Sequence, residues 1–235
     1  MYSNNFLITG HNSMLGNLLV SELNNNYKDS TFYLISKSGK NLNVKTKNSN
    51  RFYYFKCDFL NTSKLVKKIK HINKLSGFKI RVLIMCAIIK RYKSFKLTSL
   101  KNFQNDIKIN YISNIAILKC FFSRAVHNNF YVINIASGAG VTGIVNNSSY
   151  SSSKGATQNL IESLYHEFFY TNFFFKNIFT GVFKNKKQSK YLAKEIVKNL
   201  YNKKNNIFIK IYPFISFFLK IFPRLKVYIF KIVKL

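Results

Sequence analysis

The sequence predicts an α/β fold in which helices cover both faces of a doubly wound, mostly parallel seven-stranded sheet. Short apolar, β-branched segments alternate along the chain with segments whose apolar residues recur at helical spacing. A glycine turn, Asp58, Ala87 and Ser137 each follow an apolar segment, so they would meet at the carboxyl edge of a parallel sheet. With 235 residues, 47% of them hydrophobic, the chain suits one domain with a full core.

Each element is predicted from its own pattern. The apolar runs predict strands at residues 6–8, 31–35, 51–56, 80–87, 131–135, 176–179 and 207–211. Helical spacing predicts helices at residues 15–23, 62–72, 97–128, 150–170 and 190–201. The long helix would have one apolar side that faces the core. This side is formed by Ile107, Tyr111, Ile115, Ile117 and Leu118.

The charge of the chain is extreme, with 38 basic against 7 acidic residues and a formal net charge of +31. Such a charge suits nucleic acid or an anionic membrane surface. Heavy use of Lys, Asn, Ile, Phe and Tyr equally indicates the compositional bias of an A/T-rich genome, and the lysines are spread along the whole chain. The chain contains no recognisable nucleic-acid motif, so no specific nucleic-acid partner is predicted.

Few side chains are suited to metal binding. The three cysteines form no CxxC pair and the four histidines have no metal-ligand spacing, so no metal is expected.

The first twenty residues contain no signal peptide. The expected location is the cytoplasm, with a peripheral position on the inner face of a membrane as an extension of that hypothesis.

Residues 206–235 differ in character from the domain predicted over residues 1–205. They begin with the last strand and continue as a basic, aromatic-rich segment, with no run of 18 apolar residues that would cross a bilayer. Two interpretations stay open. The segment lies in a membrane interface, where a lipidic substrate would be presented, or it packs on its own domain or on a second subunit.

A strand-to-helix segment from Ile133 to Lys154 has the strongest chemical pattern. Ser137 ends the strand thirteen residues before Tyr150, and Tyr150 lies four residues before Lys154. Residues four apart share a helix face, so the Lys154 ammonium would sit beside the Tyr150 phenol and lower its pKa from about 10. Tyr150 would then exchange a proton near neutral pH, while Ser137 holds a substrate oxygen.

The first glycine turn, Thr9-Gly10 to Gly16, joins a strand to a helix. A phosphate would be favoured at such a helix start, although a generic strand–helix connection explains the pattern as well. The second strand ends without an acid, in a segment that contains Lys37 and Lys40. Basic residues there suit the 2′-phosphate on the adenine ribose of NADP better than the free 2′-hydroxyl of NAD.

These motifs together resemble the short-chain dehydrogenase/reductase family, over about residues 4–181. The turn at residues 9–16 is similar to the family's TGxxxGxG, and Ser137, Tyr150 and Lys154 reproduce its Ser-x12-Tyr-x3-Lys signature. The resemblance implies a Rossmann-type fold and the catalytic set Asn110, Ser137, Tyr150 and Lys154. It also implies cofactor contacts from Thr9, Gly10, Ser13, Met14, Leu15, Gly16, Lys37, Asp58, Ala87, Tyr150, Lys154 and Gly181.

The activity that the resemblance implies is hydride transfer between NADP, or NAD, and a carbonyl/alcohol pair. The substrate would be a small molecule or a lipid. Tyr150 would be the general acid of reduction, and Lys154 would hydrogen-bond the nicotinamide ribose. Ser137 would polarise the carbonyl, while Asn110 would hold a water in a proton relay.

Three departures from the family pattern support an alternative, a degenerate and non-catalytic dinucleotide-binding member. Met14 replaces the middle glycine of the turn, residues 85–88 keep only Ala87 of the usual Asn-Asn-Ala-Gly, and the loop after Gly181 is short. The resemblance also implies a homodimer. The helices at 97–128 and 150–170 would form its interface through Phe121, Phe122, Phe168 and Phe169, although core packing explains these rings equally.

Overall fold

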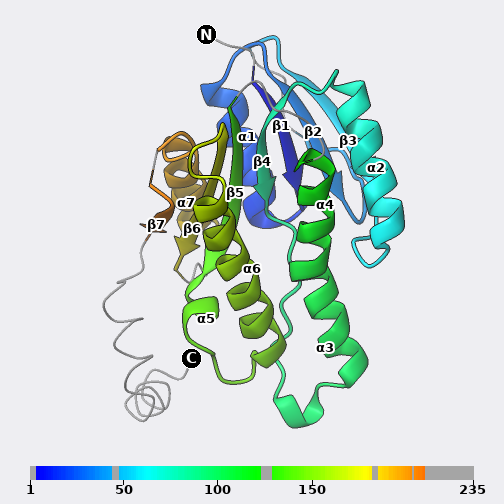
Figure 1. Ribbon diagram of the computed structural model, residues 1–235, viewed down its shortest axis with the longest axis vertical. Helices are drawn as coiled ribbons and strands as arrows, with labels where there is room; N and C mark the ends of the chain where they lie inside the picture. Colours follow the sequence, from blue (N-terminus) through cyan, green and yellow to red (C-terminus); the bar gives the residue numbers. More distant parts are fainter. Residues whose placement is uncertain (1–3, 44–47, 123–128, 182–184, 203, 210–235) are drawn as a thin grey trace.

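The computed structural model describes residues 4–43, 48–122, 129–181, 185–202 and 204–209. One sheet runs through this part of the chain, with all seven strands parallel, in the order β3-β2-β1-β4-β5-β6-β7 (Figure 1). The predicted fold class is confirmed. The strands are β1 Asn5–Thr9, β2 Thr31–Ser36, β3 Arg51–Lys56, β4 Ile80–Met85, β5 Phe130–Ser137, β6 Phe173–Thr180 and β7 Asn206–Ile209.

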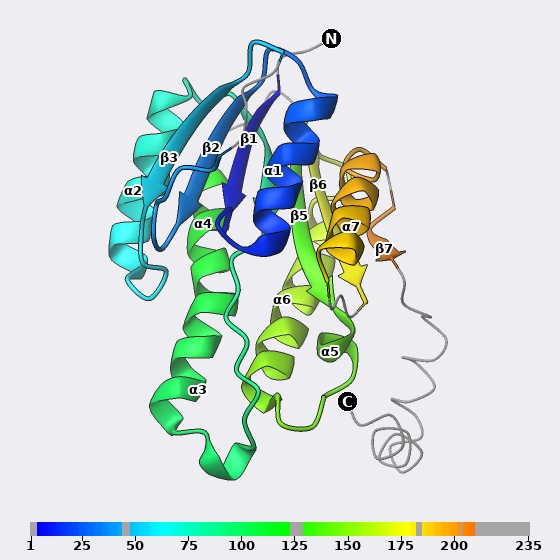
Figure 2. The same ribbon diagram turned by 180° about the vertical axis from the view of Figure 1, so that it is seen from behind.

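Helices cover both faces of the sheet. Helices α1 and α7 pack on one face, which Figure 2 shows from the front, and α2, α4 and α6 pack on the other, which faces the viewer in Figure 1. The helices are α1 Met14–Asn26, α2 Thr62–Leu75, η1 Phe95–Leu97, α3 Leu100–Ile107, η2 Lys108–Ile112, α4 Ser113–Phe122, α5 Gly138–Val141, α6 Ser148–Glu167 and α7 Lys186–Lys198.

The two cores arise from the alternation of side chains along each strand. Phe6 and Ile8 face α1 and α7, whereas Leu7 between them faces α2 and α4. Aromatic pairs fix the register of the outer strands: Phe6 stacks on Phe32 with ring centres 5.0 Å apart, and Phe32 stacks on Phe52 at 4.9 Å. Buried strands of this kind need helices on both faces.

The strand order places β1 beside β4 at the centre of the sheet, where the connections turn to opposite sides. Ligands of doubly wound sheets bind at such a point, beyond the carboxyl ends of the strands. Helices α3 and α5 and the first half of α6 extend past those ends (Figure 1). The fold therefore gathers its chemistry-bearing residues at one edge.

Two local predictions need correction. Residues 138–141, which lie outside the predicted strand at 131–135 and the predicted helix from residue 150, form the short helix α5. The Ser137 side chain caps this helix by accepting from the Ala139 amide at 3.2 Å. Helix α7 begins at Lys186 rather than at residue 190, since the Asn185 side chain caps its first turn. The connection from Gly181 to α7 is thus shorter than predicted.

The single helix predicted over residues 97–128 is three helices in the described part, with the π-helical turn η2 between α3 and α4. A π turn inserts one residue and rotates the following side chains by about 100°. The predicted apolar side is therefore wrong in its first half: Asp106 and Asn110 are buried there, whereas Ile107 and Tyr111 are only partly buried. Beyond the π turn, Ile117 and Leu118 are buried as predicted, whereas Ile115 is only partly buried.

The aromatic residues proposed for a dimer interface mostly pack within the chain. Phe121 stacks on Phe130 at 4.8 Å, and Phe122 contacts Phe168 at 4.8 Å. Phe169 stays 56% exposed. Core packing is confirmed for Phe121 and Phe122, and the homodimer stays a prediction.

Strand β7 contains the described part of the C-terminal segment. The membrane-interface prediction for this segment rests on residues 210–235, which lie outside the described residues. Within the described ranges, no helix combines the length and the apolar character needed to span a bilayer.

Candidate active site

The carboxyl ends of β1 and β4 are bound together by one threonine. Thr9 Oγ1 accepts hydrogen bonds from the amides of Cys86 and Ala87, both at 3.1 Å. The Thr9 side chain is fully buried, so these bonds remove two backbone donors that would otherwise lack partners. They fix the segment after β4 next to the β1–α1 turn.

Glycine allows the close contact between these two segments. Gly10 has φ +71°, and a Cβ atom on it would lie 2.6 Å from Ala87 Cα. At Gly16 a Cβ atom would lie 2.4 Å from the Gly10 carbonyl oxygen, so the first turn of α1 also depends on a glycine. Ser13 caps α1 by accepting from the Gly16 amide at 3.0 Å. The turn thus presents a helix N-terminus at the sheet edge.

A cavity of about 670 Å³ opens beside this turn. Five of the predicted cofactor residues line it: Gly10, Ser13, Lys37, Asp58 and Ala87. Its other lining residues, which the sequence analysis did not single out, are Asn12, Ser36, Ser38, Lys56, Phe59, Cys86, Ile88, Ile89 and Ile109. A mostly apolar crevice beside a helix N-terminus has the form of a nucleotide site.

Seven of the twelve predicted cofactor residues do not line this crevice: Thr9, Met14, Leu15, Gly16, Tyr150, Lys154 and Gly181. Leu15 belongs to the core, and Gly181 pairs through its amide with the Ile209 carbonyl at 3.1 Å. Thr9 lies beneath the turn, and Met14 points elsewhere: its sulfur lies 3.9 Å from Ser189 Oγ on α7. Met14 therefore does not put its side chain into the crevice.

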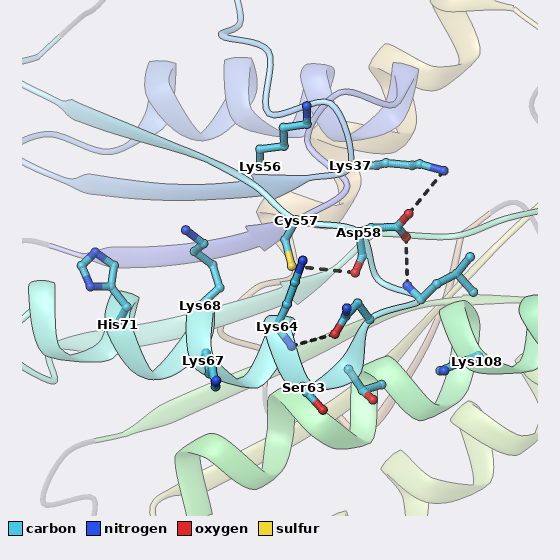
Figure 3. A pocket seen from close by; sticks show the side chains of 13 residues that line it. Lys37, Lys56, Cys57, Asp58, Ser63, Lys64, Lys67, Lys68, His71 and Lys108 are labelled. Atoms are coloured by element: carbon cyan, nitrogen blue, oxygen red, sulfur yellow. Dashed lines mark hydrogen bonds and ion pairs between the residues drawn. The ribbon is translucent and has the colours of Figure 1, made fainter.

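A second, strongly basic cavity of about 960 Å³ continues from the crevice and shares Lys37, Lys56 and Asp58 with it. Figure 3 shows lysines from several elements around it, with Asp58 as its acid and an ion pair from Lys37 Nζ to Asp58 at 3.5 Å. Six of its thirteen lining residues are lysines, against 38 lysines and arginines in the 235 residues of the chain. The enrichment indicates a site for anionic groups beyond the general basic character of the chain.

The predicted residues Ser137, Tyr150 and Lys154 do meet at the carboxyl end of β5. The side chains of Ser137 and Tyr150 are hydrogen-bonded to each other. Lys154 Nζ donates to the Ile135 carbonyl at 2.7 Å, two residues before Ser137 along the strand. Tyr150 and Lys154 are both buried, at 7% and 3% exposure.

Helix α6 brings Tyr150 and Lys154 to the strand because polar residues on its buried face bind the sheet. Gln158, one turn beyond Lys154, donates to the Ser137 carbonyl at 2.7 Å, and Asn177 on β6 donates to the Gln158 carbonyl at 3.1 Å. Gly140 leaves room for the Gln158 side chain, since a Cβ there would come within 2.5 Å of it.

The pKa of Tyr150 differs in direction from the sequence prediction. Burial raises the pKa of Tyr150 above its ordinary value of 10, and the hydrogen bond with Ser137 offsets this only in part. Burial also lowers the pKa of Lys154 from 10.5 to about 8, while its electrostatic interaction with Cys86 acts in the opposite sense. The predicted lowering of the Tyr150 pKa is wrong because burial is its largest cause of shift, and Ser137, rather than Lys154, supplies the opposing contribution.

Asn110 lies in the π turn and connects the segment after β4 to α6. Its side-chain oxygen accepts from the Ile89 amide at 2.8 Å, and its nitrogen donates to the Ile89 carbonyl and to Ser153 Oγ, both at 2.9 Å. Both N–H donors of the Asn110 amide are therefore used within the chain. A role in a proton relay stays a prediction.

The model of the short chain dehydrogenase family matches residues 4–196, which is most of the chain. That span includes the β1–α1 turn, the crevice and the Ser137–Tyr150–Lys154 cluster. The chain belongs to the short-chain dehydrogenase family. Members of this family are oxidoreductases. No curated protein sequence matches the chain.

Solved structures of other short-chain dehydrogenases have the same fold at low sequence identity. A 4-hydroxyisoleucine dehydrogenase complexed with NADH is 18% identical, with a TM-score of 0.75 over 88% of this chain and 97% of that one. A Brucella ovis oxidoreductase in complex with NAD is 17% identical, with a TM-score of 0.73 over 89% and 100%. A Mycobacterium smegmatis short-chain dehydrogenase is 12% identical, with a TM-score of 0.74 over 89% and 92%.

The sequence analysis missed a polar set at the end of β2. The side-chain oxygen of Asn12 on the β1–α1 turn accepts from Ser36 Oγ at 3.0 Å, and Ser36 Oγ accepts from the Gly39 amide at 3.0 Å. Serines and asparagines are so frequent in this chain that their types alone gave no signal. Their place at adjacent strand ends was the available clue.

We predict that Gly10→Ala lowers the free energy of unfolding by at least about 2 kcal/mol, because a left-handed backbone and a contact with Ala87 are both imposed on the new methyl group. Urea denaturation measures the change. Gly143→Ala is the control, since a Cβ there meets nothing within 4 Å. Equal effects of the two substitutions would contradict the role of Gly10.

Proposed function

We propose that this short-chain dehydrogenase interconverts a carbonyl and an alcohol with a nicotinamide dinucleotide, and that the dinucleotide is NADP. The observation that supports this most is the Ser137–Tyr150 hydrogen bond beside the buried Lys154 ammonium. These groups lie at the sheet edge that also forms the crevice, and Cys86, which lines the crevice, interacts electrostatically with Lys154.

The crevice suits a dinucleotide in shape and chemistry. Gly10 leaves the backbone bare where the α1 N-terminus would meet a pyrophosphate, and Phe59 and Ile88 offer apolar walls for an adenine. Solved structures of the same fold include complexes with NADH and NAD. When bound, the nicotinamide would supply the hydride for reduction or accept it in oxidation.

The residues of the chain would handle the proton. In reduction, Tyr150 Oη donates its proton to the carbonyl oxygen, and the Ser137 hydroxyl donates a hydrogen bond to that oxygen and orients it. The raised pKa of Tyr150 keeps the phenol protonated at neutral pH, which suits reduction. The Lys154 ammonium stabilises the phenolate that remains.

The preference for NADP follows from charge. Lys37 and Lys56 line both the crevice and the basic cavity, where a 2′-phosphate on the adenine ribose would lie. Lys37 pairs with Asp58, but the Lys37 side chain is 77% exposed and that of Asp58 is 43% exposed. The pair is therefore weak, and the Lys37 ammonium remains available to a phosphate. A lipidic substrate stays a prediction, because it depends on residues 210–235.

A non-catalytic member of the family is the alternative. The Met14 side chain points away from the crevice, so one of the three sequence departures no longer supports this alternative. The altered segment at residues 85–88 and the short connection after Gly181 still favour it. A carbonyl-reduction assay combined with NADPH fluorescence titration separates the two, because a non-catalytic member would reduce no carbonyl even where it binds NADPH. No binding at high micromolar NADPH would indicate a scaffold that has lost its cofactor function as well.

We predict that Tyr150→Phe lowers kcat for carbonyl reduction about 10²- to 10⁴-fold, because the proton donor is removed. NADPH affinity should stay unchanged, since Tyr150 does not line the crevice. Assays follow NADPH absorbance with a panel of carbonyl compounds. Tyr170→Phe, at a residue 97% exposed, is the control. Full turnover by Tyr150→Phe would remove the assignment.

The pH profile should report Lys154. The pKa of Lys154 is about 8, so its charge is present below that pH and is lost above it, while Tyr150 stays protonated. We expect kcat/KM for reduction to be level below pH 8 and to fall above it. Lys154→Arg, which keeps its charge, should have lower activity without this decline. A wild-type profile level to pH 10 would contradict this assignment.

We predict that Lys37→Ala weakens NADPH binding about tenfold and changes NADH binding less than about twofold, because only NADPH carries the 2′-phosphate. Fluorescence titration at low salt measures both constants, and the difference should shrink as salt is added. Lys101→Ala on α3 removes an exposed lysine outside both cavities and is the control. Equal losses for the two dinucleotides would argue against the NADP preference.

A further inference from the structure

Asp106 is a buried carboxylate close to the proposed catalytic groups. All seven acidic residues of the chain lie in the described ranges, and Asp106 alone among them is buried, with no exposed surface. A carboxylate removed from water is costly unless donors surround it. Its position in a chain so poor in acids therefore needs an explanation.

Two segments far apart in the sequence donate to this carboxylate. Arg91 Nε, from the segment after β4, donates to Oδ1 at 2.9 Å, and Ser149 Oγ, from the first turn of α6, donates to Oδ2 at 2.7 Å. Each oxygen of Asp106 thus holds a different element against α3. Hydrogen bonds to a charged acceptor are about twice as strong as neutral ones.

Both donors are sequence neighbours of groups at Tyr150. Ser149 directly precedes Tyr150 at the start of α6. Arg91 directly follows Lys90, whose Nζ lies 5.5 Å from the centre of the Tyr150 ring. The Asp106 carboxylate therefore fixes the Tyr150 backbone on one side and the Lys90 segment on the other.

A second connection repeats this pattern one helical turn further on. Asn110 lies four residues after Asp106 and binds Ile89 and Ser153. Ser153 in turn lies four residues after Ser149, and it directly precedes Lys154. Helices α3 and α6 run side by side in Figures 1 and 2, and these two polar connections join them in register. Between them they hold the turn of α6 that carries Tyr150 and Lys154.

We propose that Asp106 is a positioning residue for Tyr150. Its carboxylate holds the first turn of α6 and the Lys90 segment so that the phenol stays hydrogen-bonded to Ser137. This inference rests on the proposed function for its effect on turnover. Its effect on the Tyr150 phenol does not depend on that function.

The test uses the full chain with Asp106→Asn, Ser149→Ala and the double variant. Asp106→Asn keeps the size of the side chain and removes its charge. Glu162→Gln is the control, because it neutralises an exposed carboxylate on α6, the helix that contains Ser149 and Tyr150. The readouts are kcat and KM for carbonyl reduction, the NADPH dissociation constant, and the 13Cζ resonance of Tyr150 with its pH titration, assigned through Tyr150→Phe.

We expect Asp106→Asn to lower kcat about 10- to 100-fold, to leave the NADPH dissociation constant within twofold, and to shift the Tyr150 resonance. Ser149→Ala should act in the same direction but less strongly. The double variant should match Asp106→Asn, because both substitutions break one connection. Glu162→Gln should match the wild type in every readout.

An unchanged kcat together with an unchanged Tyr150 resonance in Asp106→Asn overturns the proposal. Equal losses of kcat and NADPH affinity, with additive effects in the double variant, also overturn it, because they indicate a general loss of structure. If Asp106→Asn does not fold, Ser149→Ala alone decides through the same resonance. A wild-type chain without carbonyl reduction refutes the proposed function, while the resonance still tests the position of Tyr150.

Discussion

The site depends on one constraint, the burial of a polar helix face. The first half of α6 buries mostly polar side chains against the sheet and α3, among them Ser149, Ser153, Lys154, Thr157 and Gln158. Each of these groups has to find a partner, because an unpaired buried polar group costs about 1–3 kcal/mol. Lys154 binds a carbonyl of β5, Gln158 binds another, and Thr157 donates to the Asn110 carbonyl at 3.0 Å. A helix held by so many directed bonds has one register on the sheet, and that register puts Tyr150 beside Ser137.

The same burial sets the electrostatics of the site. In water a lysine four residues from a tyrosine would favour the phenolate, but removal from water disfavours both charged forms. The pKa of Tyr150 is consequently raised and that of Lys154 is lowered to about 8. The Tyr150 phenol is therefore protonated at neutral pH, which is the state that the proposed role of proton donor requires.

Much of the fold could be predicted because the strands are short, apolar and separated by turn residues. All seven strands and the meeting of Ser137, Tyr150 and Lys154 followed from spacing, since the ends of parallel strands lie at one edge. The π turn at Lys108–Ile112 could not be predicted, because it has no signature in residue types. It changes which residues of the predicted long helix face inward, and thereby brings Asp106 and Asn110 to α6.

The sequence by itself determined the α/β fold, the family and the residues at the carboxyl edge, because side-chain period and motif spacing are local properties. Only the tertiary structure decided that Met14 turns towards α7, that burial raises the pKa of Tyr150, and that Asp106 joins three segments. Those outcomes depend on which surfaces exclude water from one another. Ser149 and Arg91 are far apart in the sequence and reach one carboxylate only after the chain has packed. No local pattern in the sequence indicates that they will be close.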